Sequence, residues 1–328
     1  MLTDSWIISQ LISQVCALAL LGGALYNGVG IFFKWDANST SDLQLQLERK
    51  TYLISTIVQF VMIFQVVSLL MFLNTVNIHL PSVVKGAMCA TGALGANEFG
   101  YPTLYIKVGA VLVYATYLFM HQLDESEPEF PLTPLKYWIL PLAFLLVGAD
   151  LVLMILYFAN INPDVIATCC SVAFIGSGAK ADFLGNGGID PIIYIGTSSL
   201  SFFALIGSVL FIKKKANLLS LWISIVFSIS STLALRYYFV KYIYGLPSHL
   251  CLFDIFFGQY YFIGYVIFGA YYITVIAALL KSILALSEGR LKTEHHSLDK
   301  ILGRIIIVAG TVALAIPLSY WLAWSGEL

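Results

Sequence analysis

Charged residues are scarce in this sequence, and their scarcity excludes an ordinary water-soluble globular protein. Asp, Glu, Lys and Arg make up 11% of the 328 residues, 59% of the residues are hydrophobic, and the mean hydropathy is +0.88. A typical soluble domain carries roughly 25% charged residues. The formal net charge is −1 and the lysines and arginines form no basic patch, so nucleic acid is not expected as a partner. We expect the lipid bilayer to surround this chain.

Histidines and known catalytic motifs are also scarce. A b-type haem in a membrane protein needs histidine ligands that face each other inside helices, whereas the five histidines here lie at the ends of apolar runs or between them. The chain has no Cys-x-x-Cys-His segment, P-loop, Gly-x-Ser-x-Gly or His-Glu-x-x-His motif. We therefore expect no haem, no nucleotide hydrolysis and no serine or zinc protease chemistry.

Long apolar runs are what the sequence has in quantity. Runs of about 20 apolar residues predict membrane-spanning helices, because a helix satisfies all its backbone hydrogen bonds in lipid. The first run follows the acidic segment "MLTDSW", so we expect it to be a membrane helix and not a cleaved signal peptide. The sequence predicts an all-α, polytopic membrane protein with eight helices, at 6–33, 52–78, 103–121, 136–160, 191–212, 217–243, 255–284 and 301–324.

Lysines and arginines are distributed unevenly between the two ends of these runs. If the runs cross the membrane alternately, twelve of the 17 lie on the side opposite residue 1 and five lie on the side of residue 1. Cytoplasmic loops carry an excess of Lys and Arg. This predicts a multi-pass protein of the cell (inner) membrane with both termini extracytoplasmic.

Three turns on the predicted outer face resemble one another: "HLPSVVKGAMC" (79–89), "INPDVIATCC" (161–170) and "GLPSHLCLFDIFFG" (245–258). Their prolines are 82 and 84 residues apart, and four of the five cysteines follow those prolines. One interpretation is a single membrane domain, 1–328, of three parallel helix–turn–helix repeats with one helix before them and one after. The alternative is that the chain has no repeat, and that the three turns resemble one another only because the outer turns of helical hairpins often contain proline. The predicted segments are helix 6–33, repeats 52–121, 136–212 and 217–284, and helix 301–324.

The repeat predicts that the cysteines of the three turns lie close together. Equivalent turns around one axis share a depth, and packed helices are about 8–10 Å apart. A disulfide tolerates a Cα separation of about 7 Å. We expect the sulfurs of Cys89, Cys251 and at least one of Cys169 and Cys170 to cluster within roughly twice that distance.

Clustered cysteines at an oxidising face favour thiol–disulfide exchange. Cys89 or Cys251 would be the nucleophile, and Lys85 or His249 would assist it as a nearby cation or proton partner. The adjacent pair Cys169 and Cys170 is typical of exchange or soft-metal capture. The alternative for each cysteine alone is a packed, inert thiol, which is how we interpret Cys16.

A soft-metal site is the main competing hypothesis. Thiolate, thioether and imidazole ligands suit copper or zinc, which the protein would bind or transport. A third hypothesis is a membrane anchor subunit of an electron-transfer complex. The candidate ligands are His79, Met88, Cys89, Cys169, Cys170, His249 and Cys251.

Charges inside the apolar runs are further functional candidates. Asp150 and Arg236 lie at a similar predicted depth, so we expect an intramembrane charge pair, either structural or functional. Polar and aromatic groups near the outer face could bind a quinone, although an interfacial aromatic belt is the alternative. These are Lys107, Gln259, Tyr260 and Tyr261.

The third turn resembles that of the vitamin K epoxide reductases and of the bacterial disulfide-oxidising membrane proteins, which use a Cys-x-x-Cys pair at a helix end beside a bound quinone. The resemblance is confined to 245–258, and Asp254 stands where the second cysteine would be. It implies a thiol–disulfide oxidoreductase that exchanges with an extracytoplasmic thiol protein and passes electrons to a quinone.

Overall fold

The computed structural model is helical in every regular element that it describes. Eight of these helices are long and apolar enough to cross a membrane, which confirms the all-α, multi-pass prediction. The residues that the structure describes are 4–34, 41–84, 87, 89–127, 130–161, 191–211, 217–245, 251–287, 291 and 296–324.

The spans lie close to the predicted ones because the length of each apolar run largely determines where a membrane-spanning helix begins and ends. Where they extend further, as in the second span, most of the extra residues are polar turns at the helix ends, which carry little hydropathy signal. The seventh span begins at Ile263 and not at 255, because Asp254–Phe256 and Gly258–Tyr260 form two short 3-10 helices before it. The spans are Ser5–Ile31, Asp42–Ser82, Gly100–Glu125, Thr133–Ala159, Ile192–Leu210, Leu218–Tyr244, Ile263–Ser287 and His296–Trp324.

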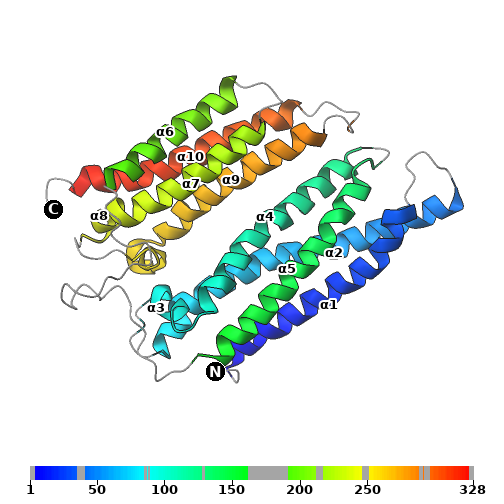
Figure 1. The fold of residues 1–328 in the computed structure, drawn as a ribbon, viewed down its shortest axis with the longest axis horizontal. Coiled ribbons are helices and arrows are strands. Elements are labelled where there is room, and N and C mark those ends of the chain that lie inside the picture. Colours follow the sequence, from blue (N-terminus) through cyan, green and yellow to red (C-terminus); the bar gives the residue numbers. More distant parts are fainter. Residues whose placement is uncertain are drawn as a thin grey trace. The chain divides into compact units, whose positions relative to one another are not determined.

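The chain divides into two compact units, which are described separately. Unit 1 is a four-helix bundle in which α2 contacts α1 and α4, and α5 also contacts α1 and α4 (Figure 1). Phe72, Tyr157 and Phe158 fill its core, and Gly28 leaves room for the ring of Tyr137. Its helices are α1 (Ser5–Lys34), α2 (Asp42–Asn74), α4 (Gly100–Glu125) and α5 (Thr133–Ala159).

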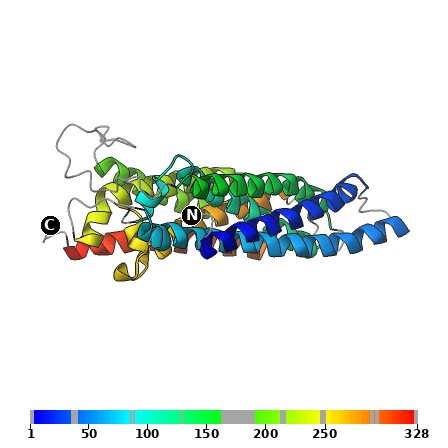
Figure 2. The ribbon, with the colours of Figure 1, turned by 90° about the horizontal axis from the view of Figure 1, so that it is seen from below.

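Unit 2 contains the later helices, which also run beside one another in both views (Figure 1; Figure 2). Phe202, Phe227 and Tyr271 form a row of contacting rings in its interior. Residues 89–92 belong to this unit too. Its helices are α6 (Pro191–Phe211), α7 (Asn217–Ala234), α8 (Val240–Tyr244), α9 (Ile263–Ser287) and α10 (His296–Trp324). The predicted repeat 136–212 is thus shared between the two units.

Two helices change to π-helical geometry shortly before a cysteine turn. η1 (Thr75–His79) ends α2, and η5 (Leu235–Phe239) joins α7 to α8. A π-helical turn inserts an extra residue and shifts the register of the residues after it, and such turns are frequent at functional sites. The chain then reaches Cys89 and Cys251 respectively.

Candidate dithiol site

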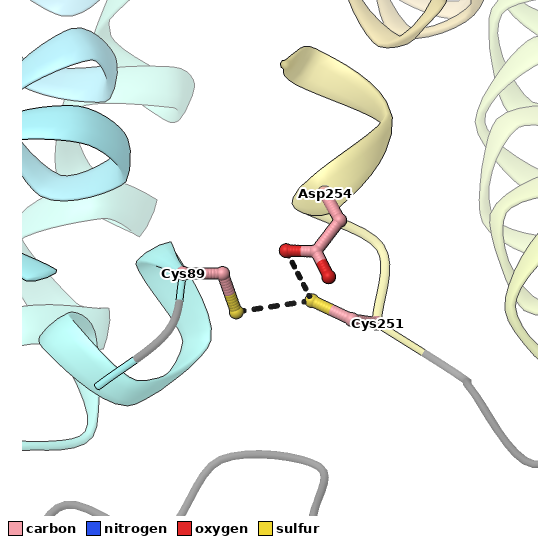
Figure 3. Close-up of side chains that lie close together, drawn as sticks. All are labelled: Cys89, Cys251 and Asp254. Atoms are coloured by element: carbon pink, nitrogen blue, oxygen red, sulfur yellow. Dashed lines mark hydrogen bonds between the residues drawn. The ribbon is translucent and has the colours of Figure 1, made fainter. Parts of the chain in front are cut away.

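Two cysteines from turns far apart in the sequence meet in unit 2. The Sγ atoms of Cys89 and Cys251 are 3.1 Å apart although the residues are 162 positions apart in the chain. Their exposed fractions are 2% and 1%, and both are reduced thiols. The predicted clustering of these two sulfurs is confirmed (Figure 3).

Local backbone geometry places each sulfur. Cys89 directly precedes the short helix α3 (Ala90–Leu94). On the other side, α8 ends at Gly245, whose φ of +65° is the left-handed conformation that commonly ends helices at glycine. The Tyr244 hydroxyl donates a hydrogen bond of 2.6 Å to the carbonyl oxygen of Cys251, which ties the end of α8 to the cysteine backbone.

Polar groups surround the sulfur of Cys251. Its thiol donates to Asp254 Oδ1 at 3.5 Å (Figure 3), and the backbone N–H of Phe253 donates to the sulfur at 3.4 Å. Thr91 Oγ1 lies 3.4 Å from the same atom. N–H donation stabilises a thiolate, while Asp254 offers a carboxylate that can accept the thiol proton. The sulfur of Cys251 therefore has a carboxylate that can accept its proton and an N–H group that donates to it.

The acidic group also acts on a neighbouring tyrosine. Tyr260 lies in η7 (Gly258–Tyr260), and its ring meets that of Tyr244 edge-on at 4.7 Å. Burial, and secondarily the negative charge of Asp254, raises the pKa of Tyr260. Tyr260 consequently keeps its proton at neutral pH and presents a hydroxyl group there.

Aromatic rings lead away from the dithiol toward an apolar groove. Phe253 and Phe257 pack against the two cysteines. Phe256, in η6 (Asp254–Phe256), contacts the ring of Tyr265 at 4.8 Å between centroids. Tyr265 in turn lines a groove of about 520 Å³ between α9 and α10, whose other walls are mostly aliphatic and include Arg304. Its volume falls within the range of about 300–1,000 Å³ that is usual for small-molecule sites.

Among the other predicted cysteine-site residues, the structure describes only His79. It lies in unit 1, where its Nε2 is 3.0 Å from Asp4 Oδ2. The predicted residues outside the described part of the chain are Lys85, Met88, Cys169, Cys170 and His249.

The predicted quinone residues do not line the groove. Gln259 and Tyr260 belong to η7, and Tyr261 follows it with a φ of +55° and an exposed fraction of 86%. Lys107 is buried inside unit 1. α4 begins at Gly100, so Lys107 lies two turns inside the helix and not at its end.

The intramembrane charge pair has a different partner from the predicted one. Asp150 Oδ2 accepts from Lys107 Nζ at 2.7 Å, within unit 1. Arg236 belongs to unit 2, where its guanidinium lies 5.4 Å from the ring centroid of Tyr237. Arg236 was predicted as the partner only because its predicted depth matches that of Asp150. Packing decides which helices face each other, and the sequence pattern does not show it.

Sequence reasoning also missed residues that contribute to the two polar centres. The sequence pattern marked Asp254 only as a replacement for cysteine, and Thr91 carried no signal. Gln14 contacts Asp150 of the charge pair in unit 1, and Gln65 contacts Gln14. Glutamines in the middle of otherwise apolar runs were a usable signal, because polar side chains in membrane helices usually face the protein interior.

No family model, curated protein or solved structure matches this chain. The class of protein is therefore defined by the fold and the site: an all-helical, multi-pass membrane protein with a buried dithiol.

Proposed function

We propose that this protein is a membrane thiol–disulfide oxidoreductase whose redox pair is Cys89 and Cys251. The observation that carries the proposal is the 3.1 Å separation of two buried thiol sulfurs from distant turns. A disulfide needs an S–S distance of about 2.05 Å, so a small side-chain movement suffices to form it. The carboxylate beside Cys251 supplies an acceptor for the proton that leaves.

The reaction balances as a two-electron exchange. In the oxidised protein, a thiolate of an extracytoplasmic partner attacks the Cys89–Cys251 disulfide, and that bond breaks as a mixed disulfide forms. The partner's second thiol displaces the mixed disulfide and leaves both protein cysteines reduced. The dithiol would then give up two electrons and two protons, for which a bound quinone would be the acceptor, as the Cys89–Cys251 bond forms again. Asp254 would take the proton of Cys251 in that step and pass it on to the acceptor.

The groove between α9 and α10 is the place in unit 2 that suits a quinone. Its aliphatic walls match an isoprenoid tail, and Tyr265 and Arg304 offer polar contacts. Phe256 connects the groove residue Tyr265 to the turn that carries Cys251.

The proposed setting is the cell inner membrane, with both termini and the cysteine turns on the extracytoplasmic side. The uneven distribution of lysines and arginines supports this orientation. The parallel helix–turn–helix repeat also remains a proposal. It is supported by the π-helical turns η1 and η5, which precede Cys89 and Cys251 by similar chain lengths.

Mass-tag alkylation tests the redox pair directly. In a Cys169→Ser, Cys170→Ser background, membranes are treated with a soluble quinone, denatured and labelled with a maleimide-polyethylene glycol. We expect one tag without reductant, on Cys16, and three tags after reduction. The Cys16→Ser control should lose one tag in both conditions, whereas Cys89→Ser should carry two tags in both. Three tags before and after reduction in the starting variant would contradict the proposal.

A soft-metal site is the second candidate, because Cys89, Cys251 and Asp254 place their three ligand atoms within 4.8 Å of one another. Zn–S bonds of about 2.3 Å in a tetrahedral site separate two sulfurs by about 3.8 Å, so the thiols would move slightly apart. Elemental analysis of purified protein distinguishes the two functions. Stoichiometric zinc or copper that disappears in both Cys89→Ser and Cys251→Ser would favour the metal site, and a metal-free protein that forms the disulfide would exclude it.

A further inference from the structure

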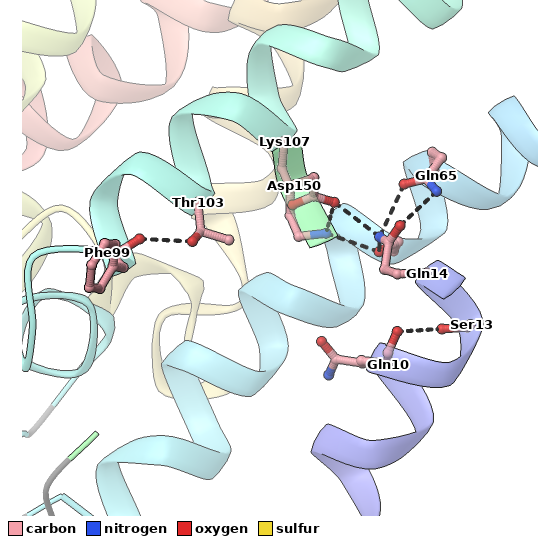
Figure 4. A network of polar contacts seen from close by, with 9 residues as sticks. Gln10, Ser13, Gln14, Gln65, Phe99, Thr103, Lys107 and Asp150 are labelled. Carbon is pink, nitrogen blue, oxygen red and sulfur yellow. Dashed lines mark hydrogen bonds and ion pairs between the residues drawn. The ribbon is translucent and has the colours of Figure 1, made fainter. Parts of the chain in front are cut away.

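Unit 1 has a charged centre buried among its four helices. Lys107 from α4 and Asp150 from α5 form an ion pair of 2.7 Å, with side-chain exposures of 2% and 3% (Figure 4). Ionisable groups inside a membrane are costly and usually mark a substrate, ion or proton pathway. The thiol chemistry of unit 2 makes no use of this pair.

Helices α1 and α2 add uncharged polar groups to the pair. Gln14 Nε2 lies 3.1 Å from Asp150 Oδ2 and 2.7 Å from Ser68 Oγ, and Gln14 and Gln65 exchange hydrogen bonds of 3.1 and 2.9 Å. Lys107 also donates to Ser68 at 3.1 Å. These amides and hydroxyls satisfy donors and acceptors of the ion pair that the pair itself leaves open.

One oxygen of the Asp150 carboxylate takes no part in the ion pair with Lys107. Asp150 Oδ1 is buried and has no hydrogen-bond partner among the residues that the structure describes. A buried carboxylate oxygen without a partner is energetically unfavourable, and protonation of that oxygen removes the cost. Lys107 and Gln14 contact Asp150, and the charge of Asp150 also acts on the Tyr114 hydroxyl, further along α4.

Buried hydroxyls continue from Tyr114 toward the C-terminal end of α4. Tyr117 lies one turn further along the helix, and its hydroxyl and that of Tyr137 face Ser55 Oγ. Within the described part of the chain these three oxygens make no direct hydrogen bond. Buried polar atoms of this kind are normally satisfied by internal water, and hydrated hydroxyl groups can pass protons along.

The row of polar groups ends at a small cavity. His121, one turn beyond Tyr117, lines it together with Thr51, Glu48 and Glu125, and the His121 Nδ1 atom has no partner among the described residues. The cavity has about 10 Å³ of space for the centre of a water molecule, which is close to what one water needs. This end of unit 1 therefore provides an imidazole and carboxylates from which a proton can enter.

Polar groups also extend from the centre toward the N-terminus of α1. Gln10 lies one turn before Gln14, and its amide donates to Thr75 Oγ1. Gln10 Oε1 is buried without a partner in the described residues. The Asp4–His79 pair then lies at the half-exposed end of this row.

We propose that unit 1 is a proton pathway across the membrane, with Asp150 as its central proton-binding group and Lys107 as the balancing charge. A proton from the aqueous phase reaches Asp150 Oδ1, neutralises the carboxylate and weakens its attraction to Lys107. It then leaves along the opposite row, and the ion pair reforms. The transmembrane proton gradient drives the step, so no oxidant or reductant is required.

Proton flux into liposomes containing the purified protein tests this proposal. A valinomycin-imposed potassium potential drives the flux, and a trapped pH-sensitive dye reports it. We expect Asp150→Asn to lower the flux about tenfold or more, because the variant side chain binds no proton. Asp299→Asn is the matched control: it removes the acid of the Lys281–Asp299 pair (2.6 Å) in unit 2. It should stay within about twofold of wild type, since this pair contributes no group to the row of polar groups in unit 1.

A more conservative variant, Tyr117→Phe, keeps the proposal testable if Asp150→Asn fails to fold. Tyr117→Phe removes one hydroxyl from the row and keeps the ring in the core, and it should lower the flux several-fold with an unchanged gel-filtration profile. Equal flux in wild type, Asp150→Asn and Tyr117→Phe would overturn the proposal. A wild-type flux no greater than that of protein-free liposomes would overturn it as well. Neither result depends on the cysteines.

Discussion

At the residue scale, the proposed chemistry depends on the interaction between the Asp254 carboxylate and the Cys251 thiol. Asp254 Oδ1 accepts from the thiol of Cys251 at 3.5 Å, while the N–H of Phe253 approaches the same sulfur. A negative charge beside a thiol disfavours a standing thiolate, so its benefit must lie in accepting the proton during reaction. Asp254 therefore acts as a general base and not as a thiolate stabiliser.

The exchange of Asp254 for asparagine tests this role. We expect Asp254→Asn to slow disulfide formation by a soluble quinone about 10²-fold at pH 7, which is typical of a lost general base. The difference should shrink above pH of about 8.5, where a free thiol ionises without help. Stopped-flow measurement of quinol formation against pH gives the answer. A slowing of equal size at every pH would mean that Asp254 only supports the fold of the turn.

A second residue-scale prediction concerns Asp4, which lies just outside the first span. The hydrogen bond from His79 lowers the pKa of Asp4 and is the largest effect; burial opposes it, and the backbone N–H groups of Trp6 and Ile7 lower the pKa further. A carboxyl whose pKa is lowered by folding stabilises the fold above its ordinary pKa of about 3.9 and loses that effect as the pH falls through the lower, folded value.

Trp6 reports this loss because its indole N–H donates to Thr75 Oγ1 at 2.6 Å. We expect Trp6 fluorescence to stay constant from pH 7 to about 4 and to change below the ordinary pKa of aspartate. The Asp4→Asn variant is the control and should show no such transition. A transition of the same size in the variant would assign it to another group.

At the element scale, the turn between α4 and α5 is held by a buried carboxylate. Asp124 accepts from the backbone N–H of Leu132 at 2.7 Å, from Thr133 Oγ1 at 2.6 Å and from Lys136 Nζ at 2.7 Å. The side chains of Asp124 and Lys136 are 0% and 2% exposed. One acid thus caps the start of α5 and fixes its angle to α4.

Removal of this acid should destabilise unit 1 strongly. We expect Asp124→Ala to cost about 3–5 kcal/mol, because it leaves Lys136 buried without its charge partner. Glu125→Ala changes the exposed neighbouring acid and should stay within about 0.5 kcal/mol of wild type. Thermal unfolding in detergent measures both. Equal melting temperatures for the two variants would show that the pair contributes nothing to the turn.

The elements themselves were largely predictable from sequence, and the contacts between them were not. The length of each apolar run determined the eight spans, since a bilayer of about 30 Å demands about 20 residues. The contact of Cys89 with Cys251 was predicted from a repeat of three turns; the contact is confirmed, and the repeat stays a prediction. The partner of Asp150 was mistaken for two reasons. The predicted start of α4 at 103 left Lys107 near the outer face, whereas the helix begins at Gly100. Depth also does not fix the rotation of a helix, and packing places Lys107 beside the carboxylate.

At the scale of the whole molecule, each compact unit has its own polar centre. Unit 1 holds the Lys107–Asp150 pair among α1, α2, α4 and α5, and unit 2 holds the dithiol. Residues 89–92 belong to unit 2 although the chain on both sides of this segment contributes to unit 1. No local sequence pattern predicts such an assignment, because it arises from contacts between residues that are more than a hundred positions apart.

The central claim is that Cys89 and Cys251 form a reversible disulfide, and peptide mass spectrometry tests it most directly. Membranes are treated with a soluble quinone, blocked with iodoacetamide, digested without reductant and searched for linked peptides. We predict one abundant species that joins the peptide of Cys89 to the peptide of Cys251, forms in step with quinol and disappears after reduction. Cys89 and Cys251 recovered only as separate alkylated peptides, while quinone is still consumed, would contradict the claim.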